Sequence, residues 1–499
     1  MLEPDRVVGS LALHTRNPGP LDPGEALTMQ RLRGADAYHL YEESENEHRH
    51  TIKVCIVDPS TAREPSDIET ARHELEHGLG YVPPFQWQLV QTPFEIAHPL
   101  WAYRRNFDLD YHVRHTTVVT PGEAREFAEV VSEIASTGLE RDRPLWQLWI
   151  VEGLAGGHVA YVAKLHHSLA DGQSSAQILL DSFTSSPDAP PSHSEHPFES
   201  DEPIPSPGRL FLDGLRDNFR IWRGVPKLML RLSRVGIQAL GRRLRRKPPP
   251  VRLFKATDTR FNRKLTPHRW FATVELPIAD LKRVKNLLGG SLNDVYTSVC
   301  GGAIRRYLEA RGELPAGSMV AAIPVSRRKP EEARVYGNRV SSWVVSLATD
   351  CADPLERYHT VRESIAAARA IQENGDPDLI PDIMDAWWLH KFFMAMSQGL
   401  MSRITRRCAM HAIVSNVRGP SEPRYLNGAK LVGLQSMGPL IEGVGLNFTG
   451  WSYVDTLHVG ITACREHVPD IWALADGVET ELEELLEAAD NAAAATSRR

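Results

Sequence analysis

The chain has 499 residues, of which 42% are hydrophobic, and a formal net charge of -6. This length exceeds what one hydrophobic core normally holds, so we expect two or more domains. The small net charge gives no indication of nucleic-acid binding, and the scattered cysteines predict neither a disulfide framework nor a zinc ribbon. We find no secretory leader and no apolar run near the roughly 18 residues of a membrane span, so we expect a cytoplasmic protein.

The first elements alternate between strand and helix patterns. Residues 1–28 hold Pro, Gly and Asp without a sustained period and predict a loose extension. Residues 51–57 predict a strand, and 68–79 an amphipathic helix. His112 and His115 follow, and we interpret them as part of a polar strand edge rather than as catalytic groups, because no Asp-Gly turn accompanies them.

Two neighbouring strands are predicted next. Pro144-Leu145-Trp146 leads into an apolar strand at 148–151, which we expect to pair beside a mostly buried strand at 158–165. Trp146 is interpreted as a core anchor or a pocket wall.

Between the second of these strands and a predicted helix stand two adjacent histidines followed by Asp-Gly, in the stretch His166-His167-Ser168-Leu169-Ala170-Asp171-Gly172. Imidazole suits proton transfer near neutral pH, because its ordinary pKa is about 6.5. Successive side chains of an extended segment point to opposite sides, so His166 and His167 are expected to differ in role. We expect Asp171 to brace the turn through an arginine or to orient a ring, and Gly172 to permit close backbone approach or a positive φ. No zinc-ligand spacing is present, and the plainer alternative is a pair of hydrogen-bonded, partly buried histidines.

The composition changes after residue 184. Residues 185–207 are dominated by Pro, Ser, Asp and Glu, which predicts a linker between two halves. In 209–247, arginine and lysine are interleaved with aromatic and aliphatic residues. Such a basic helix suits an anionic lipid surface. A helix that crosses between the halves with a solvated basic face fits equally well, and Pro226 would break that helix in two.

The second half begins with a predicted strand at 270–276 and a helix at 278–288. The next helix opens at Ser291, where a Ser-x-x-Asp pattern has two interpretations. Asp294 is either a capping-box residue or a site residue. Asn293 is freer to face a pocket, where its amide could hold a developing oxyanion.

A strand at 320–326 ends at Arg327 and Arg328, with 337–340 close behind. Arginines there either meet the phosphates of coenzyme A or are surface charges. Large, soft side chains gather in a predicted helix at 385–401, which could line an acyl-chain tunnel but more simply belongs to a core.

Strands at 446–453 and 457–463, a helix from 470 to about 489 and an alanine-rich tail complete the predicted elements.

The histidine motif resembles the signature of acyltransferases that use an acyl thioester, a superfamily that includes chloramphenicol acetyltransferase and the condensation domains of peptide synthetases. Further stretches are similar, in order, to motifs of the wax ester synthase/diacylglycerol acyltransferase family: Arg143-Pro144-Leu145-Trp146, Ser291-Leu292-Asn293-Asp294-Val295, Ser415-Asn416-Val417-Arg418-Gly419-Pro420 and Gly445-Leu446-Asn447. The resemblance runs from about Leu32 to the last helix. Arg418 departs from it, since the family more often has proline there.

The resemblance implies an α/β fold of two chloramphenicol-acetyltransferase-like halves joined by a linker, with an active-site channel between them. The expected division is a loose extension (1–28), an N-terminal half with the histidine motif (29–184), a linker with the basic helix (185–250), a C-terminal half (251–490) and a tail (491–499).

The implied activity is acyl-coenzyme A-dependent transfer of a long-chain acyl group to the hydroxyl of diacylglycerol, of a long-chain alcohol, or of both. His167 would take the proton of the hydroxyl and return it to the leaving thiolate. The expected catalytic residues are His167, His166, Asp171, Gly172 and Asn293, and the expected substrate-binding residues are Pro144, Leu145, Trp146, Asp294 and Asn416.

We expect acyl-coenzyme A as a co-substrate, no resident cofactor, no metal and no nucleic-acid partner. Arg209–Lys247 is the expected contact with a membrane or lipid droplet, which would place the protein at the inner face of the membrane. The alternatives are an O-acyltransferase for a secondary-metabolite or polyketide alcohol, and a non-catalytic homologue that binds lipid or acyl-coenzyme A.

Overall fold

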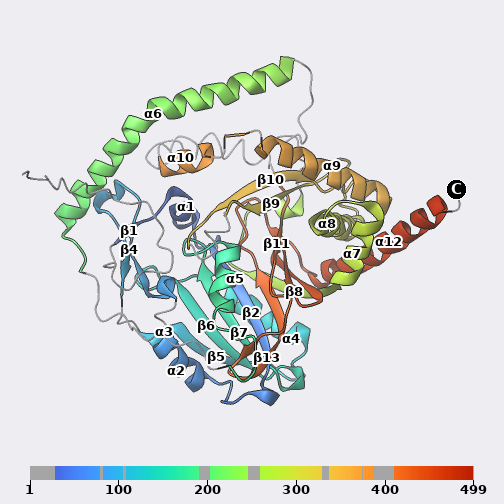
Figure 1. The fold of residues 1–499 in the computed structure, drawn as a ribbon, viewed down its shortest axis with the longest axis horizontal. Coiled ribbons are helices and arrows are strands. Elements are labelled where there is room, and N and C mark those ends of the chain that lie inside the picture. Colours follow the sequence, from blue (N-terminus) through green and yellow to red (C-terminus); the bar gives the residue numbers. More distant parts are fainter. Residues whose placement is uncertain are drawn as a thin grey trace, which may run out of the picture.

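Three β-sheets form the framework of the protein in a computed structural model (Figure 1). The structure describes residues 29–78, 82–104, 108–189, 203–244, 259–328, 336–373, 375–376, 378–386 and 410–497. The expected N-terminal extension, most of the linker and nearly all of the helix expected at 385–401 lie outside the described residues.

The first six-stranded sheet carries the histidine strand, β7. Strand β7 pairs antiparallel with β2 on one side and with β6 on the other, so that Leu165 lies opposite Thr51 and Trp146. The predicted pairing of β6 with β7 is confirmed. In spatial order the strands are β12 (Tyr425–Leu426), β13 (Ala429–Met437), β2 (His50–Asp58), β7 (Val159–His166), β6 (Trp146–Glu152) and β5 (Val113–Thr117). Strands β12 and β13 come from the second half of the chain, so both halves build this sheet.

The second six-stranded sheet comes from the second half alone. Strand β11 is parallel to both of its neighbours, β9 and β14, and the other pairs are antiparallel. In spatial order the strands are β10 (Val340–Ser346), β9 (Val320–Ser326), β11 (Ala412–Val417), β14 (Leu446–Tyr453), β15 (Thr456–Cys464) and β8 (Arg269–Pro277). A small third sheet has the order β1 (Gln30–Arg31), β4 (Leu100–Tyr103) and β3 (Trp87–Val90).

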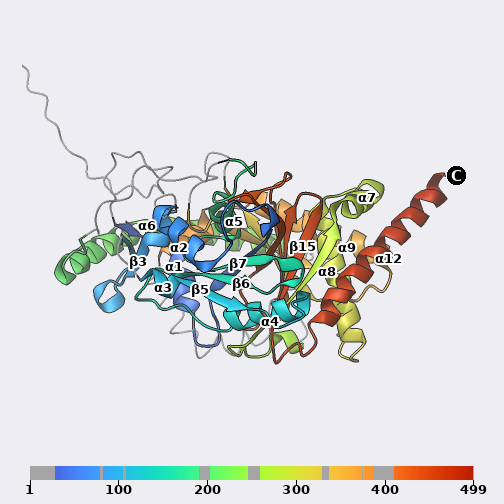
Figure 2. The ribbon, with the colours of Figure 1, turned by 90° about the horizontal axis from the view of Figure 1, so that it is seen from below.

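Helices cover the sheets (Figures 1 and 2). The helices of the first half are α1 (Gly34–Glu42), α2 (Ile68–Gly78), α3 (Leu109–His112), α4 (Ala124–Ala135) and α5 (Gly172–Leu180). Those of the second half are α7 (Ile278–Leu288), α8 (Leu292–Glu309), α9 (Pro354–Glu373), α10 (Leu379–Asp385) and α12 (Trp472–Ser497). Helix α8 shows why these segments are helical: Val295, Val299, Ile304 and Leu308 recur at helical spacing and are all buried.

Helix α4 joins the two halves. The hydroxyl of Ser132 accepts a hydrogen bond from the backbone N of Phe271, and that of Ser136 accepts one from the backbone N of Arg269, each at 2.9 Å. Both donors lie on β8, the edge strand of the second sheet. The outer side of an edge strand has unpaired backbone N–H groups. Two such groups of β8 donate to serines at α4, and these hydrogen bonds join the second sheet to the first half.

Helix α6 (Pro207–Leu244) continues through Pro226, so the expectation that proline breaks it is wrong. An internal proline costs about 3 kcal/mol. Burial of Leu210 before it and of Leu228 after it, each 5% exposed, holds both segments against the protein.

The last helix, α12, includes most of the expected tail, because its alanines have the highest helix propensity. No helix in the described part of the chain is both long and apolar enough to cross a membrane.

Candidate active site

The histidine motif forms a strand–turn–helix unit. Strand β7 ends at His166, and α5 begins at Gly172. Asp171 is the N-cap of α5, with its Oδ1 accepting from the backbone N of Ser174 at 2.9 Å. The backbone N of His167 donates to the carbonyl O of Arg49 at 2.7 Å. The turn is therefore held at one end by the sheet and at the other by a capped helix.

The two histidines have different environments, as predicted. His166 is 1% exposed; its Nδ1 accepts from the backbone N of Ser168 at 3.2 Å, and its Nε2 lies 3.7 Å from Oε1 of Glu43. His167 is half-buried, and its Nδ1 lies 3.0 Å from Oδ1 of Asn338, a residue of the second half. His166 thus belongs to the core of the first half, and His167 lies where the halves meet.

Asp171 braces the turn through an arginine, which confirms that expectation. Nη2 of Arg328 donates to Oδ2 of Asp171 at 2.8 Å, and the backbone N of Arg339 donates to the same oxygen at 3.1 Å. The side chains of Arg328 and Asp171 are 3% and 1% exposed. Both interpretations of Arg328, as a phosphate contact and as a surface charge, are therefore wrong, because its guanidinium is buried against Asp171. Arg327, the other arginine considered, lies 3.6 Å from Asp378.

Asn338 connects His167 to the first helix. Its Nδ2 donates to the carbonyl O of His167 at 2.7 Å and to Oδ1 of Asp36 at 2.9 Å, and its backbone N donates to that same carboxylate oxygen at 2.6 Å. Gly337 precedes it at a φ of +89°, where a Cβ would lie 3.1 Å from Oδ2 of Asp36. Glycine is required for this approach of backbone to carboxylate.

The electrostatics of the site favour a neutral His167. Burial has the largest effect and lowers the pKa of His167 below its ordinary 6.5; Asp171 raises it, Lys53 lowers it, and the hydrogen bond to Asn338 raises it. Burial also lowers the pKa of Lys53 to about 8 and raises that of Asp36 to about 6. A neutral imidazole is the form that accepts a proton.

Gly172 does not have the role expected of it. It is the first residue of α5 and lacks a positive φ. A Cβ there would lie 3.7 Å from Cγ2 of Val417, an ordinary contact. The expectation of a close backbone approach or a positive φ is wrong, because the turn is closed by Asp171 as the N-cap. The same contact brings β11, which ends at Val417, to the start of α5.

Trp146 is a core anchor. Leu145 and Trp146 are completely buried, and Nε1 of Trp146 donates to the carbonyl O of Phe85 at 2.7 Å. The carbonyl O of Leu145 accepts from the backbone N of His166 at 2.9 Å. These residues support the histidine turn, and substrate binding by Pro144, Leu145 and Trp146 stays a prediction.

The Ser291 motif forms the predicted capping box. The hydroxyl of Ser291 accepts from the backbone N of Asp294 at 3.2 Å, and Oδ2 of Asp294 accepts from the backbone N of Ser291 at 2.7 Å. Asn293 is half-buried in the first turn of α8, and Asn416 is exposed on β11. The site roles of Asn293, Asp294 and Asn416 stay predictions.

His112 and His115 have separate environments. His115 lies on the edge strand β5, 2.7 Å from Oε2 of Glu152, which confirms the strand-edge interpretation. His112 is buried at the end of α3, with its Nδ1 2.7 Å from the carbonyl O of Trp146, so that interpretation is wrong for it.

Sequence reasoning missed Asp36 and Asn338 as site residues. They are 302 positions apart, and no spacing rule connects them. The detectable signal was the Gly337-Asn338 pair, since glycine before a polar residue marks a close backbone approach.

Two joined α/β halves with the His-His-x-x-x-Asp-Gly turn at their junction have the predicted chloramphenicol-acetyltransferase-like fold, which the solved condensation domains share. The sequence profile of the wax ester synthase/diacylglycerol acyltransferase catalytic domain matches residues 32–296, and that of the WS/DGAT C-terminal domain matches residues 336–486. The chain therefore belongs to the wax ester synthase/diacylglycerol acyltransferase family.

Known proteins agree with this assignment. Two Mycobacterium tuberculosis proteins named as diacylglycerol O-acyltransferases are each 34% identical to the chain. Each alignment includes 92% of this chain, together with 97% of one relative and 98% of the other. The wax ester synthase/diacylglycerol acyltransferase from Marinobacter aquaeolei VT8 is 25% identical, with a TM-score of 0.67 over 92% of this chain and 100% of that one. The first condensation domain of the calcium-dependent antibiotic synthetase shares the fold, with a TM-score of 0.54 at 16% identity over 93% of this chain and 96% of that one. The predicted family, fold class and acyltransferase activity are confirmed.

Proposed function

We propose that the protein transfers a long-chain acyl group from acyl-coenzyme A to the hydroxyl of diacylglycerol, of a long-chain alcohol, or of both. The observation that carries this proposal is the contact of Nδ1 of His167 with Oδ1 of Asn338 at 3.0 Å, in a chain 34% identical to relatives named as diacylglycerol O-acyltransferases. Burial lowers the pKa of His167, which favours the neutral ring. Because Nδ1 is occupied, Nε2 is the ring nitrogen that meets the substrate.

The proposed transfer is direct. Nε2 of His167 takes the proton of the acceptor hydroxyl as the oxygen attacks the thioester carbonyl. The C–S bond then breaks, and the imidazolium returns the proton to the thiolate of coenzyme A. Acyl-coenzyme A is a co-substrate, and the step uses no resident cofactor. Such a base contributes a factor of about 10² to 10⁴ in rate, and Asn293 is the proposed donor to the oxyanion.

The test is coenzyme A release from palmitoyl-coenzyme A, measured with a thiol reagent and followed by lipid extraction. Purified protein is given a diacylglycerol or hexadecanol, with His167→Ala in parallel. Ester formed with wild type and lost in the variant supports the proposal and ranks the two acceptors. Equal release by both proteins would remove His167 from the mechanism, and release without either ester would require a different acceptor.

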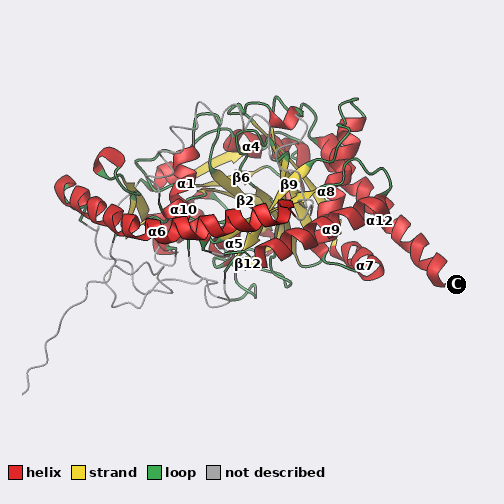
Figure 3. Cartoon of the chain, turned by 90° about the horizontal axis from the view of Figure 1, so that it is seen from above, coloured by secondary structure: helices red, strands yellow, loops and turns green. Residues whose placement is uncertain are grey.

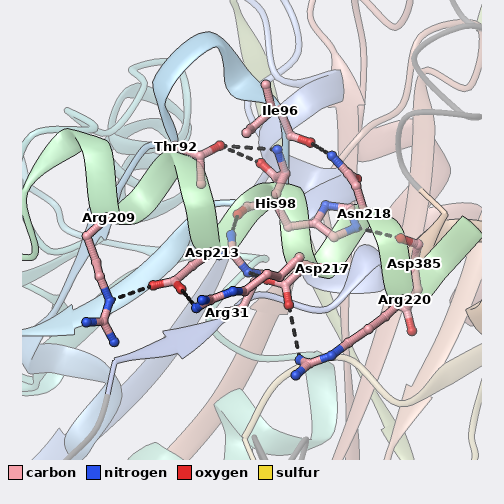
Figure 4. Close-up of polar contacts among 12 residues, drawn as sticks. Arg31, Thr92, Ile96, His98, Arg209, Asp213, Asp217, Asn218, Arg220 and Asp385 are labelled. Carbon is pink, nitrogen blue, oxygen red and sulfur yellow. Dashed lines mark hydrogen bonds and ion pairs between the residues drawn. The ribbon is translucent and has the colours of Figure 1, made fainter.

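We also propose that α6 lies on an anionic lipid surface, where the substrates are held. One face of its first segment is docked on the protein (Figures 3 and 4). Asp217 pairs with Arg31 of β1, and the side-chain amide of Asn218 donates to the carbonyl O of Ile96. Leu210 is buried on the same side. This segment is thus oriented by the small sheet.

The segment after Pro226 is docked on the second half. Leu228 is buried, and Arg231 pairs with both Asp376 and Asp382. Arg231 is therefore a docking residue, although it belongs to the basic set that the sequence assigned to a lipid contact.

The opposite side of α6 exposes apolar and basic side chains. Its exposed apolar residues lie three or four positions apart up to Trp222 and then about two helical turns apart: Leu212 (55% exposed), Leu215 (46%), Phe219 (65%), Trp222 (55%), Leu230 (54%) and Ile237 (69%). Exposed basic residues flank this stripe: Arg209, Arg216, Arg220, Arg223, Lys227 and Arg234. An apolar stripe beside cations is the arrangement of a helix that lies in the interface of an anionic membrane.

Vesicle flotation tests this surface. Phosphatidylcholine vesicles with phosphatidylglycerol should carry wild type, vesicles without it should carry less, and added salt should release the protein. Phe219→Glu with Trp222→Glu should abolish flotation, whereas Val119→Glu, at a residue 69% exposed outside α6, should not. Flotation of the double variant would overturn the proposal. A wild-type dimer that dissociates into monomers in the double variant would overturn it as well.

A further inference from the structure

Asn338 occupies a position that determines which nitrogen of His167 carries a proton. Its two amide atoms are distinguished by their partners. Nδ2 faces the carbonyl O of His167 at 2.7 Å and the carboxylate of Asp36 at 2.9 Å. Both partners are oxygen atoms that accept hydrogen bonds, so the amide group facing them is NH₂, and the opposite atom is the carbonyl Oδ1.

The orientation of the amide fixes the imidazole. Oδ1 of Asn338 lies 3.0 Å from Nδ1 of His167, and a carbonyl oxygen only accepts hydrogen bonds. Nδ1 must therefore be the protonated nitrogen of the neutral ring. The lone pair is on Nε2, where a general base needs it.

His166 provides the contrast within the same turn. Its Nδ1 lies 2.6 Å from Oγ of Ser168, and the backbone N of Ser168 donates to the same nitrogen at 3.2 Å. A backbone N–H only donates and a hydroxyl can donate, so Nδ1 is the acceptor and the proton of the neutral His166 ring lies on Nε2. The adjacent histidines are thus opposite tautomers. A histidine in this turn does not have the Nε2 lone pair by default, and at His167 the amide of Asn338 supplies the difference.

We propose that Asn338, oriented by Asp36, is a positioning residue that holds His167 in the Nδ1–H tautomer and keeps accepting from that N–H when the ring becomes an imidazolium. Asp36 accepts from both the backbone N and the side chain of Asn338, so the amide cannot turn over without losing bonds. Asp36 belongs to α1 of the first half and Asn338 to the second, which makes the tautomer depend on the closed junction of the halves. The proposal rests on the proposed role of His167 as the base.

The experiment compares Asn338→Ala with the exchanged pair Asp36→Asn/Asn338→Asp. Alanine removes the acceptor at Nδ1, and kcat should fall about 10²-fold with little change in KM for acyl-coenzyme A. In the exchanged pair a carboxylate oxygen at 338 accepts from Nδ1–H of His167. The amide at 36 keeps one of the two hydrogen bonds that Oδ1 of Asp36 accepts, and the bond from residue 338 to the carbonyl O of His167 is lost. The kcat of the pair should recover at least tenfold over Asn338→Ala, roughly the value of one retained charged hydrogen bond. The acidic limb of its pH profile should move to higher pH, because a carboxylate stabilises the imidazolium more than an amide does.

A purely structural role of Asn338 predicts the reverse order, since the exchanged pair alters both the buried Asp36 and the half-buried Asn338, and the alanine variant alters Asn338 alone. Thermal melting of each variant identifies losses that come from unfolding. Wild-type kcat in Asn338→Ala, a change in KM alone, or an exchanged pair that melts like wild type but stays as slow as alanine would overturn the proposal. His167→Ala is assayed beside them: an active His167→Ala overturns the base itself, whereas an inactive one beside a fully active Asn338→Ala overturns only the role of Asn338.

Discussion

Two helices of this protein have at their N-terminal end an aspartate that was considered as a site residue on the sequence alone, and the two aspartates differ in how far their hydrogen bonds reach. Asp294 exchanges hydrogen bonds with Ser291 inside one turn of α8. Asp171 caps α5 with one oxygen and, with the other, accepts from Arg328 and from the backbone N of Arg339. A motif whose bonds close locally stabilises its own helix. A motif whose bonds reach the other half of the chain ties the catalytic turn to the assembly of the whole protein.

The strongest test of this comparison removes the base from the turn. His167→Ala should lower kcat by about 10² to 10⁴ with the fold intact, because a positioned base contributes that factor. The measurement is the rate of coenzyme A release, with thermal melting as a check of folding. His115→Ala, at an exposed histidine on β5, is the control and should leave the rate unchanged.

Removing Asp171 should destabilise the protein as well as slow it. Asp171→Ala leaves the guanidinium of Arg328, 3% exposed, without its carboxylate, and a broken buried pair costs about 3 to 5 kcal/mol. Denaturant unfolding measures the loss, and a double-mutant cycle with Arg328→Ala isolates the coupling. Additive effects of the two changes would contradict a direct interaction.

The corresponding change at Asp294 should be small. Asp294→Ala removes one side of a capping box, which costs about 1 kcal/mol. The same unfolding experiment measures it. A loss as large as that of Asp171→Ala, or a fall in kcat without a change in stability, would mean that the Ser291 motif also serves the site.

The smallest expected effect is on the pH profile. His167 acts as a neutral base and burial lowers its pKa, so the acidic limb of kcat/KM should lie below pH 6.5 in wild type. Lys53→Met removes a positive charge that disfavours the imidazolium, so the pKa of His167 should rise and the limb should move to higher pH. Lys282→Met, at an exposed lysine of α7, is the control. A shift toward lower pH would contradict the assignment of Lys53.

Local patterns were the part of this structure that the sequence predicted well. The strand at 320–326 and the helix at 278–288 have the expected bounds, because the local pattern of apolar residues is enough to predict each of them. The capping box at Ser291 and the arginine brace at Asp171 were each one of two roles that the sequence offered for the aspartate. The resemblance to the acyltransferase family added the expectation of two halves with the active site between them.

Long-range partners could not be predicted in this way. The stretch that holds Asn338 was expected at most near a phosphate site, and Asp36 had no predicted role. Nothing in a single sequence relates a residue of the first helix to a loop residue 302 positions later. Pro226 shows the same limit in local form: its cost to a helix is fixed by chemistry, but the contacts of Leu210 and Leu228 that hold the helix together are tertiary.

The place of β13 in the first sheet has a consequence for synthesis. Ile52 of β2 lies opposite Met437 of β13, so the sheet that carries His167 is completed by a strand that is synthesised long after β2. Pairing between such distant segments is slow to form, and a nascent chain that ends at the linker would expose β2 as an open edge. The sheet of the first half is therefore incomplete until β13 has been synthesised, and His167 meets Asn338 only when the second half is present.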